Sequence, residues 1–166
     1  MDFNTAFDKL IDREGSYTSD YKDRGNWTTG IIGKGDLNGT KYGISAMSYP
    51  HLNIKNLSRD DAKKIYKRDF WDKMRLSDLP DDISFDMFDT AVNSGISRAV
   101  KILQKTVGSK EDGVIGNITI SLSQLSKDGL SARYNANRLL FMTDLSVWDV
   151  YGKGWARRIA NNILKS

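Results

Sequence analysis

Three of the four carboxylates in the stretch IDREGSYTSDYKDRG, near the start of the chain, are candidates for acid-base chemistry. Glu14 follows an apolar-periodic segment, and Asp20 and Asp23 stand in the polar segment behind it. Carboxyl groups break glycosidic bonds: one protonates the leaving oxygen, and a second stabilises the cation or activates water. The stretch is therefore a candidate glycosidase site, although solvated acids or salt-bridge partners of neighbouring cations would give the same residues.

Glu14 stands at the end of a helix predicted over residues 2–14, in which phenylalanine, leucine and isoleucine recur at helical spacing. Gly15 is placed to end this helix in the left-handed conformation. A catalytic acid must keep its proton near neutral pH, which requires a partly apolar environment. The negative partial charge of a helix C-terminus also disfavours ionisation there. Asp20 and Asp23, in a loop, are expected to ionise more easily and to suit base or electrostatic work.

The elements that must position these groups change character along the chain. From Trp27 to Tyr42, glycines alternate with Thr, Ile, Trp and Tyr around KGD and NG turn signals, which predicts one or two short β-hairpins. Ser58 and Asp61 form a capping-box-like helix start. Further helical patterns follow in ISFDMFDTAVNSG, RAVKILQKTV (capped by Ser97), NITISLSQL, LSARYNANRLLFMTDL and GWARRIANNILK. The pattern predicts a mainly α domain, with one small β segment near the N-terminus.

Composition limits the class of protein. The 166 residues are enough for one domain, and 39% hydrophobic content with a mean hydropathy of -0.50 is typical of a soluble globular protein. No apolar run approaches the ~20 residues that span a bilayer. The absence of cysteine excludes disulfides and thiolate chemistry. The single histidine, His51, follows a proline in a loop and is interpreted as a bystander.

The net charge of +4 suits a polyanionic partner, whether nucleic acid, anionic lipid or an acidic cell-wall polymer. The basic residues are scattered, and neither a recognition helix nor a basic-aromatic platform is present, so we expect no nucleic-acid partner. The first ten residues, MDFNTAFDKL, are amphipathic and acidic, unlike a signal peptide. We expect no stable membrane insertion and a protein made in a cytoplasm.

The arrangement REGSYTSDYKDRGNW…GTKYGIS resembles the opening of the glycoside hydrolase 108 family of phage endolysins and related bacterial N-acetylmuramidases. The resemblance continues through LSRDDAKKIYKRDFWDKM, FDMFDTAVNSGISRAVKILQK, EDGVIGNITI and GKGWARRI, so that it covers nearly the whole chain. Ser16 and Arg24 depart from the glycine and proline common in the family. The residues that match the opening in order are Glu14, Gly15, Tyr17, Asp20, Asp23, Gly25, Thr40, Gly43 and Ile44.

This resemblance implies a lysozyme-like helical domain and a catalytic role for Glu14 as the acid. Asp23, Asp20 and Thr40 are its candidate partners, and TKYGI matches as a block around Thr40. Thr28 and Thr29 are rivals, since Thr29 gives a Glu-x8-Asp-x5-Thr spacing similar to T4-type lysozymes. The resemblance also implies a single domain over residues 1–166, with a catalytic part over about 1–75 and a peptidoglycan-binding-like part over about 76–166 of the same body.

Other side chains are candidates for the glycan groove. Tyr17, Trp27 and Tyr42 carry flat rings that suit sugar faces, although core packing explains each of them equally well. Asn93, in AVNSG, is placed either to bond a sugar N-acetyl group or to cap its helix. Trp155 and Phe70 fall on apolar stripes and are expected in the core. An internal ion pair explains Asp89 and Arg157 as well as a role in the site does.

The predicted function is a peptidoglycan hydrolase that cleaves the β-1,4 bond between N-acetylmuramic acid and N-acetylglucosamine and lyses a host cell. No metal or cofactor is expected, the partner is the peptidoglycan glycan strand, and the chain is expected to be a monomer. An endolysin of this kind waits in the host cytoplasm and reaches the periplasm through a holin. Two rival functions remain, a lytic transglycosylase and a non-catalytic peptidoglycan-binding phage module.

Overall fold

The computed structural model of the chain describes residues 1–11 and 16–164. It divides into two compact units. The N-terminal unit is Asn4–Arg68, and the helical unit is Met1–Phe3 together with Asp69–Ser166. Glu14 and the predicted helix end at Gly15 lie outside the described residues. The division of roles near residue 75 that the resemblance implies concerns function, and it stays a prediction.

Two helices form the apolar base of the N-terminal unit. Helix α1 (Phe3–Ile11) buries Ala6, Phe7, Leu10 and Ile11 along one face, as its apolar spacing predicts. Helix α2 (Arg59–Tyr66) begins with the predicted capping box, in which Ser58 and Asp61 each bond the other's backbone. The rings of Phe7 and Tyr66 meet at 5.8 Å between centroids, so the two helices share one core.

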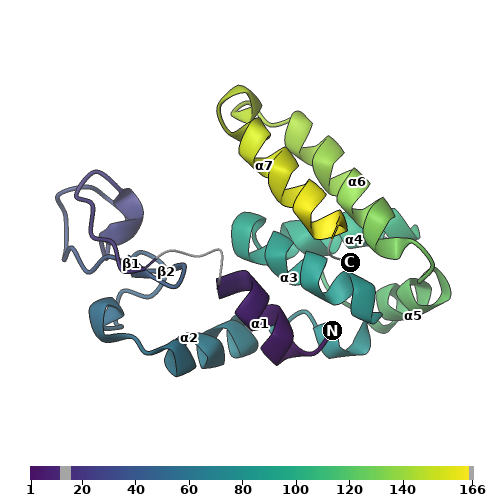
Figure 1. The fold of residues 1–166 in the computed structure, drawn as a ribbon, viewed down its shortest axis with the longest axis horizontal. Helices are drawn as coiled ribbons and strands as arrows, with labels where there is room; N and C mark the ends of the chain where they lie inside the picture. The colour runs from purple at the N-terminus through teal and green to yellow at the C-terminus, as the bar shows by residue number, and fades with distance from the viewer. Residues whose placement is uncertain (12–15, 165–166) are drawn as a thin grey trace. The chain divides into compact units, whose positions relative to one another are not determined.

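A short antiparallel hairpin belongs to the same unit (Figure 1). Strand β1 (Thr40–Lys41) pairs with β2 (Ile44–Ser45), with Thr40 opposite Ser45 and Lys41 opposite Ile44. A further bridge joins Trp27 to Leu37 and closes the glycine-rich loop between them. The predicted β segment is therefore present, but its regular strands come at its C-terminal end, because the many glycines upstream favour turns over ladders.

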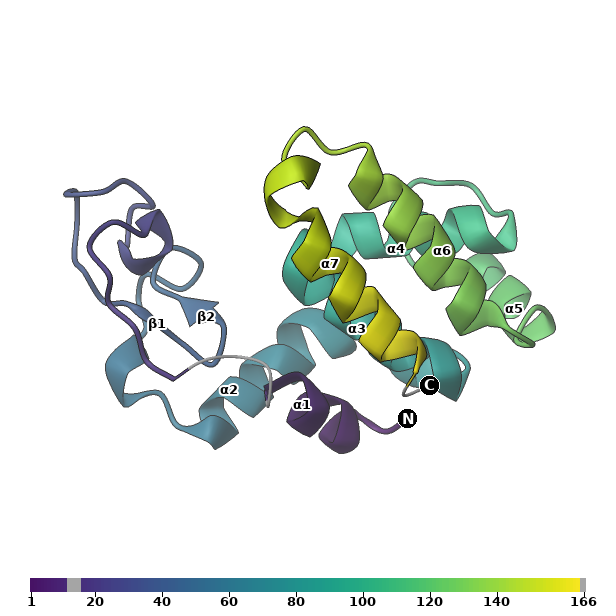
Figure 2. The same ribbon diagram turned by 45° about the horizontal axis from the view of Figure 1, so that its top comes forward.

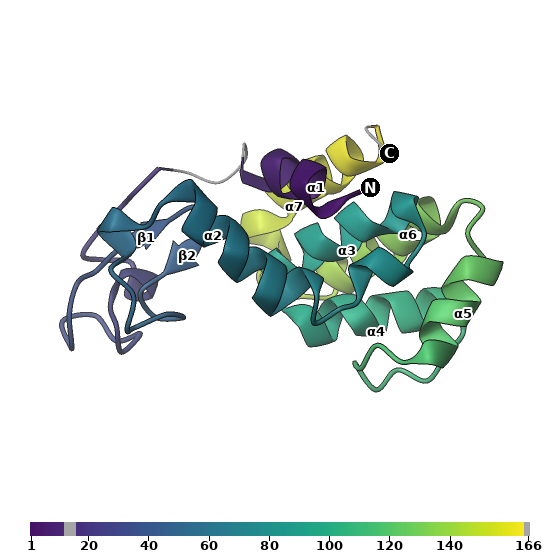
Figure 3. The same cartoon turned by 90° about the horizontal axis from the view of Figure 1, so that it is seen from below.

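The helical unit contains five α-helices among its described residues: α3 (Asp81–Ser94), α4 (Ile96–Val107), α5 (Asn117–Leu125), α6 (Leu130–Thr143) and α7 (Trp148–Ile163). Gly95 and Gly108 follow α3 and α4 with positive φ, a conformation that glycine adopts without a steric cost. Helices α6 and α7 run side by side as a hairpin in Figures 1 and 2. Figure 3 shows α5 following α4 along the same side of the unit.

Helix α3 is buried almost throughout and carries a charged residue at its centre. Asp89 is fully buried and accepts hydrogen bonds from Arg138 of α6 at 2.8 Å and from Arg158 of α7 at 2.9 Å. Asn162 of α7 donates to the same carboxylate at 3.1 Å. One carboxylate therefore joins three helices, and Arg138, 1% exposed, lies with it in the interior.

Several details of the predicted helices are wrong. The predicted internal ion pair uses Arg158 and Arg138 where the sequence suggested Arg157, which is exposed. Ser97 does not cap α4, because the helix already begins at Ile96 after Gly95. Helix α7 begins at Trp148, earlier than its predicted apolar stripe. Trp155 is half-buried and stacks on Tyr151 at 5.8 Å.

Within residues 1–11 and 16–164, no helix has the length and apolar character needed to cross a bilayer.

Candidate functional site

The candidate carboxylates lie in a tight loop, here called the carboxylate loop (Asp20–Trp27). Asp20 accepts a hydrogen bond from the backbone of Lys22 at 2.9 Å, and Asp23 accepts one from Gly25 at 2.8 Å. Asp23 thereby caps a 3₁₀ turn over Arg24–Asn26. Both side chains are exposed, and each of these bonds uses only one carboxylate oxygen. Among residues 1–11 and 16–164 the second oxygen of each group has no partner, which leaves it to water or substrate.

Asn26 holds this loop against the hairpin. Its side chain is completely buried, and its Nδ2 donates to the backbone oxygen of Asp20 at 3.0 Å. Its Oδ1 accepts from the Thr40 hydroxyl at 2.8 Å, and its backbone oxygen accepts from Gly39 at 3.0 Å. Sequence reasoning missed Asn26. The available signal was an asparagine inside a glycine-rich turn, where an amide can satisfy several backbone groups at once.

Thr40 is the candidate threonine that this arrangement joins to the carboxylate loop. It pairs with Thr18 through two backbone bonds of 2.8 and 2.9 Å, while its hydroxyl bonds Asn26. The rivals serve a different loop: Thr28 accepts from Asp36 at 3.0 Å, and Thr29 donates to the Lys34 oxygen at 2.8 Å. Thr40 thus contacts the carboxylate loop through Asn26, whereas Thr28 and Thr29 bond the loop that follows, and the catalytic choice among the three stays a prediction.

Tyr17 lies against the same backbone crossing. A Cβ atom placed on Gly39, which has φ +80°, would stand 2.6 Å from Cε2 of Tyr17 and 2.4 Å from the backbone oxygen of Thr18. Only glycine fits there, because the position combines a left-handed backbone with this close approach. The Tyr17 ring is therefore held next to the β1 backbone and stays partly exposed, which is compatible with the predicted contact to a glycan.

Tyr42 occupies the turn of the hairpin with an unusual backbone. Its φ is +52° and that of Gly43 is +73°, so both turn residues are left-handed, as a two-residue hairpin requires. A bulky residue at positive φ is strained. The Tyr66 hydroxyl donates to the Tyr42 oxygen at 2.9 Å and fixes the turn to α2. The Tyr42 ring remains partly exposed, with the ammonium group of Lys41 5.3 Å from its centre.

Trp27 was a candidate either for the glycan groove or for the core, and its position is that of a core residue. It is 7% exposed, its Nε1 donates to the backbone oxygen of Tyr21 at 2.9 Å, and the Tyr21 ring stands edge-on to it at 5.0 Å. Tyr21 is 56% exposed and carries the accessible aromatic surface of this pair. The sequence pattern could not assign the two roles, because both rings lie in an irregular loop without periodicity.

Asn93 belongs to the helical unit and is described within it. It is exposed on the last turn of α3, and its Nδ2 donates to the backbone oxygen of Asp89 at 2.7 Å. Its side-chain oxygen makes no hydrogen bond within the described part of the chain, so it can still accept one from a ligand.

The described residues contain no group of three or more His, Cys, Asp or Glu side chains arranged to hold a metal ion.

Comparisons with known proteins agree with this geometry. The family model described as glycosyl hydrolase 108 matches residues 7–95, which include the carboxylate loop and the hairpin. The solved structure of Brucella abortus SagA is similar over 96% of this chain and 90% of that chain, with a TM-score of 0.79 and 30% sequence identity. No curated protein sequence matches significantly.

The fold and the family match together define a mainly α, lysozyme-like glycosidase of the peptidoglycan-hydrolase class. The chain belongs to the glycosyl hydrolase 108 family. The resemblance identified from the sequence is thereby confirmed, as is the predicted fold class.

Proposed function

We propose that the chain is an endolysin-type N-acetylmuramidase that cleaves the β-1,4 bond between N-acetylmuramic acid and N-acetylglucosamine. The observation that carries the proposal is the family match over residues 7–95, because it spans Glu14, both loop aspartates and Thr40. Exposed carboxylates with an open oxygen, held by a buried amide, support the choice of this segment as the site.

In the proposed reaction Glu14 is the general acid. Its proton passes to the glycosidic oxygen while the bond between that oxygen and the anomeric carbon breaks. The sugar cation that forms is stabilised by a nearby ionised carboxylate, and water then attacks the anomeric carbon. The proton that the water loses passes to a carboxylate, and we assign this base role to Asp23, with Asp20 mainly ordering the loop.

The hydrogen bonding of Thr40 suits it to hold the attacking water. Its hydroxyl hydrogen is directed to Asn26, so the same oxygen presents lone pairs and can only accept from a further partner. A water that donates one hydrogen to Thr40 and the other to a carboxylate has its lone pairs free to attack the anomeric carbon. This arrangement favours hydrolysis over internal ring closure, the reaction of a lytic transglycosylase.

The surroundings follow from the same proposal. The substrate is the glycan strand of peptidoglycan, contacted by Tyr17, Tyr42 and the exposed ring of Tyr21, and the protein acts as a monomer. The net charge of +4 favours an acidic wall, with binding that weakens as salt rises. Release from a host cytoplasm through a holin would bring the enzyme to that wall.

The test uses purified sacculi and the Glu14→Gln variant, which removes the acidic proton but keeps the shape of the side chain. We expect wild type to release soluble fragments that carry a reducing sugar, and the variant to release none while its circular dichroism melt is unchanged. Mass spectrometry of the fragments separates hydrolysis from ring closure, which differ by one water. A fully active Glu14→Gln enzyme would overturn the assignment, and products lacking that water would replace it with a transglycosylase.

A further inference from the structure

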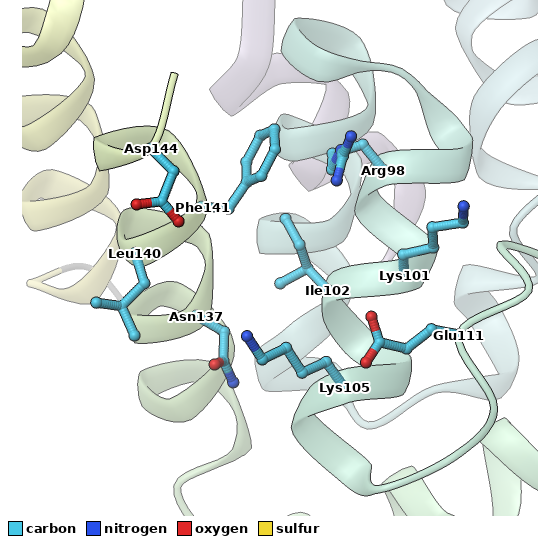
Figure 4. A pocket seen from close by; sticks show the side chains of 9 residues that line it. All are labelled: Arg98, Lys101, Ile102, Lys105, Glu111, Asn137, Leu140, Phe141 and Asp144. Atoms are coloured by element: carbon cyan, nitrogen blue, oxygen red, sulfur yellow. The ribbon is translucent and has the colours of Figure 1, made fainter. Parts of the chain in front are cut away.

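A pocket lies in the helical unit, between α4 and α6 (Figure 4). Its volume is about 160 Å³. Helix α4 contributes one wall, α6 the opposite wall, and the segment before α5 adds one acid. The lining residues are Arg98, Lys101, Ile102, Lys105, Glu111, Asn137, Leu140, Phe141 and Asp144.

Three cations follow one face of α4. Arg98, Lys101 and Lys105 are three and four residues apart, the spacing that places side chains above one another on a helix. The guanidinium carbon of Arg98 stands 4.0 Å from the centre of the Phe141 ring, a cation–π contact between the two walls. Lys105 extends from α4 toward Asn137 on α6 in Figure 4.

Two acids complete the charged lining, Glu111 and Asp144. Within the described part of the chain, neither acid forms an ion pair or a side-chain hydrogen bond, and the same holds for the three cations. The pocket thus presents positive and negative side chains that are not paired with each other. Such a lining suits a ligand that carries both positive and negative charges.

The remaining lining residues suit the backbone and small apolar groups of a peptide. Ile102 is 5% exposed and forms the floor, while Leu140 is 60% exposed at the rim. Asn137 donates its Nδ2 to Thr106 at 3.0 Å, so its Oδ1 is left to accept a hydrogen bond such as that of a peptide N–H. The pocket thus offers cations, acids, one amide acceptor and an apolar wall.

We propose that this pocket binds the short peptide that branches from peptidoglycan, so that the enzyme recognises the peptide stem as well as the sugar chain. This inference rests on the proposed function. Stem peptides carry several carboxylates, one ammonium group on their diamino acid, and alanine methyl groups. A neutral saccharide would leave the charges of the pocket unmatched, and a nucleic acid would leave Glu111 and Asp144 without a counter-charge.

In the proposed complex the carboxylates of the stem pair with Arg98, Lys101 and Lys105, and its ammonium group pairs with the two acids. Charge-assisted hydrogen bonds of this kind are about twice as strong as neutral ones. Removal of two lysines should therefore weaken binding by about tenfold, which corresponds to about 1.4 kcal/mol.

The binding test titrates the full chain with the N-acetylated tetrapeptide L-Ala–γ-D-Glu–diaminopimelate–D-Ala, whose only ammonium group is that of the diamino acid, and follows backbone amide shifts by NMR. We expect shifts at Phe141 and Asn137, an affinity about tenfold weaker in the Lys101→Gln/Lys105→Gln variant, and loss of the shifts when the peptide carboxylates are amidated. The Lys153→Gln variant, with its change on an exposed position of α7, should bind as wild type does. Equal affinity in wild type and double variant, or no shift in the wild type, would overturn the proposal.

Turnover separates this inference from the proposed function. On intact sacculi the double variant should show a raised KM with kcat retained, whereas on glycan stripped of its peptides by an amidase it should match wild type. An equal loss on both substrates would contradict a role in peptide recognition. If wild type cleaves neither substrate but the peptide shifts persist, the proposed function fails while the peptide site stands.

Discussion

Thr40 donates its hydroxyl hydrogen to the buried side-chain oxygen of Asn26 at 2.8 Å, across fourteen positions of the sequence. The same Asn26 amide donates to the backbone of Asp20 at 3.0 Å. One buried side chain therefore sets the distance between a candidate water-holding hydroxyl and the loop that carries both candidate carboxylates.

Replacement of Thr40 by valine keeps the side-chain shape and removes this hydrogen bond. We expect a loss of about 1–3 kcal/mol in the free energy of unfolding, because the oxygen of Asn26 would be buried without a donor. We also expect kcat on sacculi to fall by about a hundredfold, with little change in KM. Chemical denaturation and fragment release measure the two effects, and Thr40→Ser is the control that should preserve both. An active, stable valine variant would remove Thr40 from the mechanism.

Asparagine substitutions separate the charge of the loop aspartates from their capping bonds. In Asp23→Asn the new amide oxygen can still accept from Gly25, since asparagine caps as well as aspartate. We expect unchanged stability and a kcat lower by about two to four orders of magnitude, the usual contribution of a general base. Asp20→Asn should retain most activity. The opposite ranking of the two variants would assign the base role to Asp20.

Gly39→Ala tests the crossing that holds Tyr17. The new methyl group would stand 2.4 Å from the oxygen of Thr18, in addition to the cost of its positive φ. Gly108→Ala is the control for a left-handed backbone, since Gly108 has φ +72° and ψ 30° with nothing within 4 Å. We expect the control to cost about 1–2 kcal/mol for the backbone alone and Gly39→Ala to cost about 1–3 kcal/mol more for the overlap. Equal losses in the free energy of unfolding of the two variants, measured by urea denaturation, would show that the backbone around Gly39 shifts to accept the methyl group.

Asp89 is expected to govern the acid stability of the helical unit. Burial alone would raise the pKa of Asp89, but the charge of Arg138 and the hydrogen bond from Arg158 lower it overall. Because the folded pKa lies below the unfolded value, this stabilisation is full above about pH 4 and is lost as pH falls through the folded pKa. Asp89→Asn should cost about 3–5 kcal/mol at pH 7 and show a smaller loss in acid. Denaturation at several pH values measures this, and a pH-independent difference would contradict it.

Asp86, one turn earlier on α3, is expected to behave in the opposite sense. Burial raises the pKa of Asp86 although Ser131 donates a hydrogen bond to it. Its contribution is therefore favourable at low pH and declines as pH rises through the folded pKa. Asp86→Asn should gain stability relative to wild type as the pH rises from about 4 to 7. A difference that falls with rising pH would show that the carboxylate is stabilised as an anion.

Local signals in the sequence were sufficient for much of the fold. The Ser58–Asp61 capping box and the glycines after α3 and α4 act within one turn of backbone, so the residues that carry the signal also make the structure. The family's acid-and-glycine opening was equally readable, since its motifs are contiguous. The mainly α class followed from these elements.

What the sequence could not supply depends on contacts between distant residues. The partners of Asp89 are Arg138 and Arg158, and a shift from position 157 to 158 rotates a side chain by about 100° around its helix. Trp27 is the buried ring and Tyr21 the exposed one, which the sequence could not decide because their edge-on packing forms in a loop without a period. The role of Asn26 depends on its hydrogen bond with Thr40, fourteen residues away, which its sequence neighbours do not indicate.

The turn at Tyr42 has a consequence for anyone who would engineer this enzyme. Its left-handed tyrosine is held by a phenol that arrives from α2, twenty-four residues later in the chain. A hairpin excised from this protein and grafted elsewhere would lose that outside support and relax. When this hairpin is exchanged among relatives, residues 40–45 should therefore be transferred together with a tyrosine at position 66.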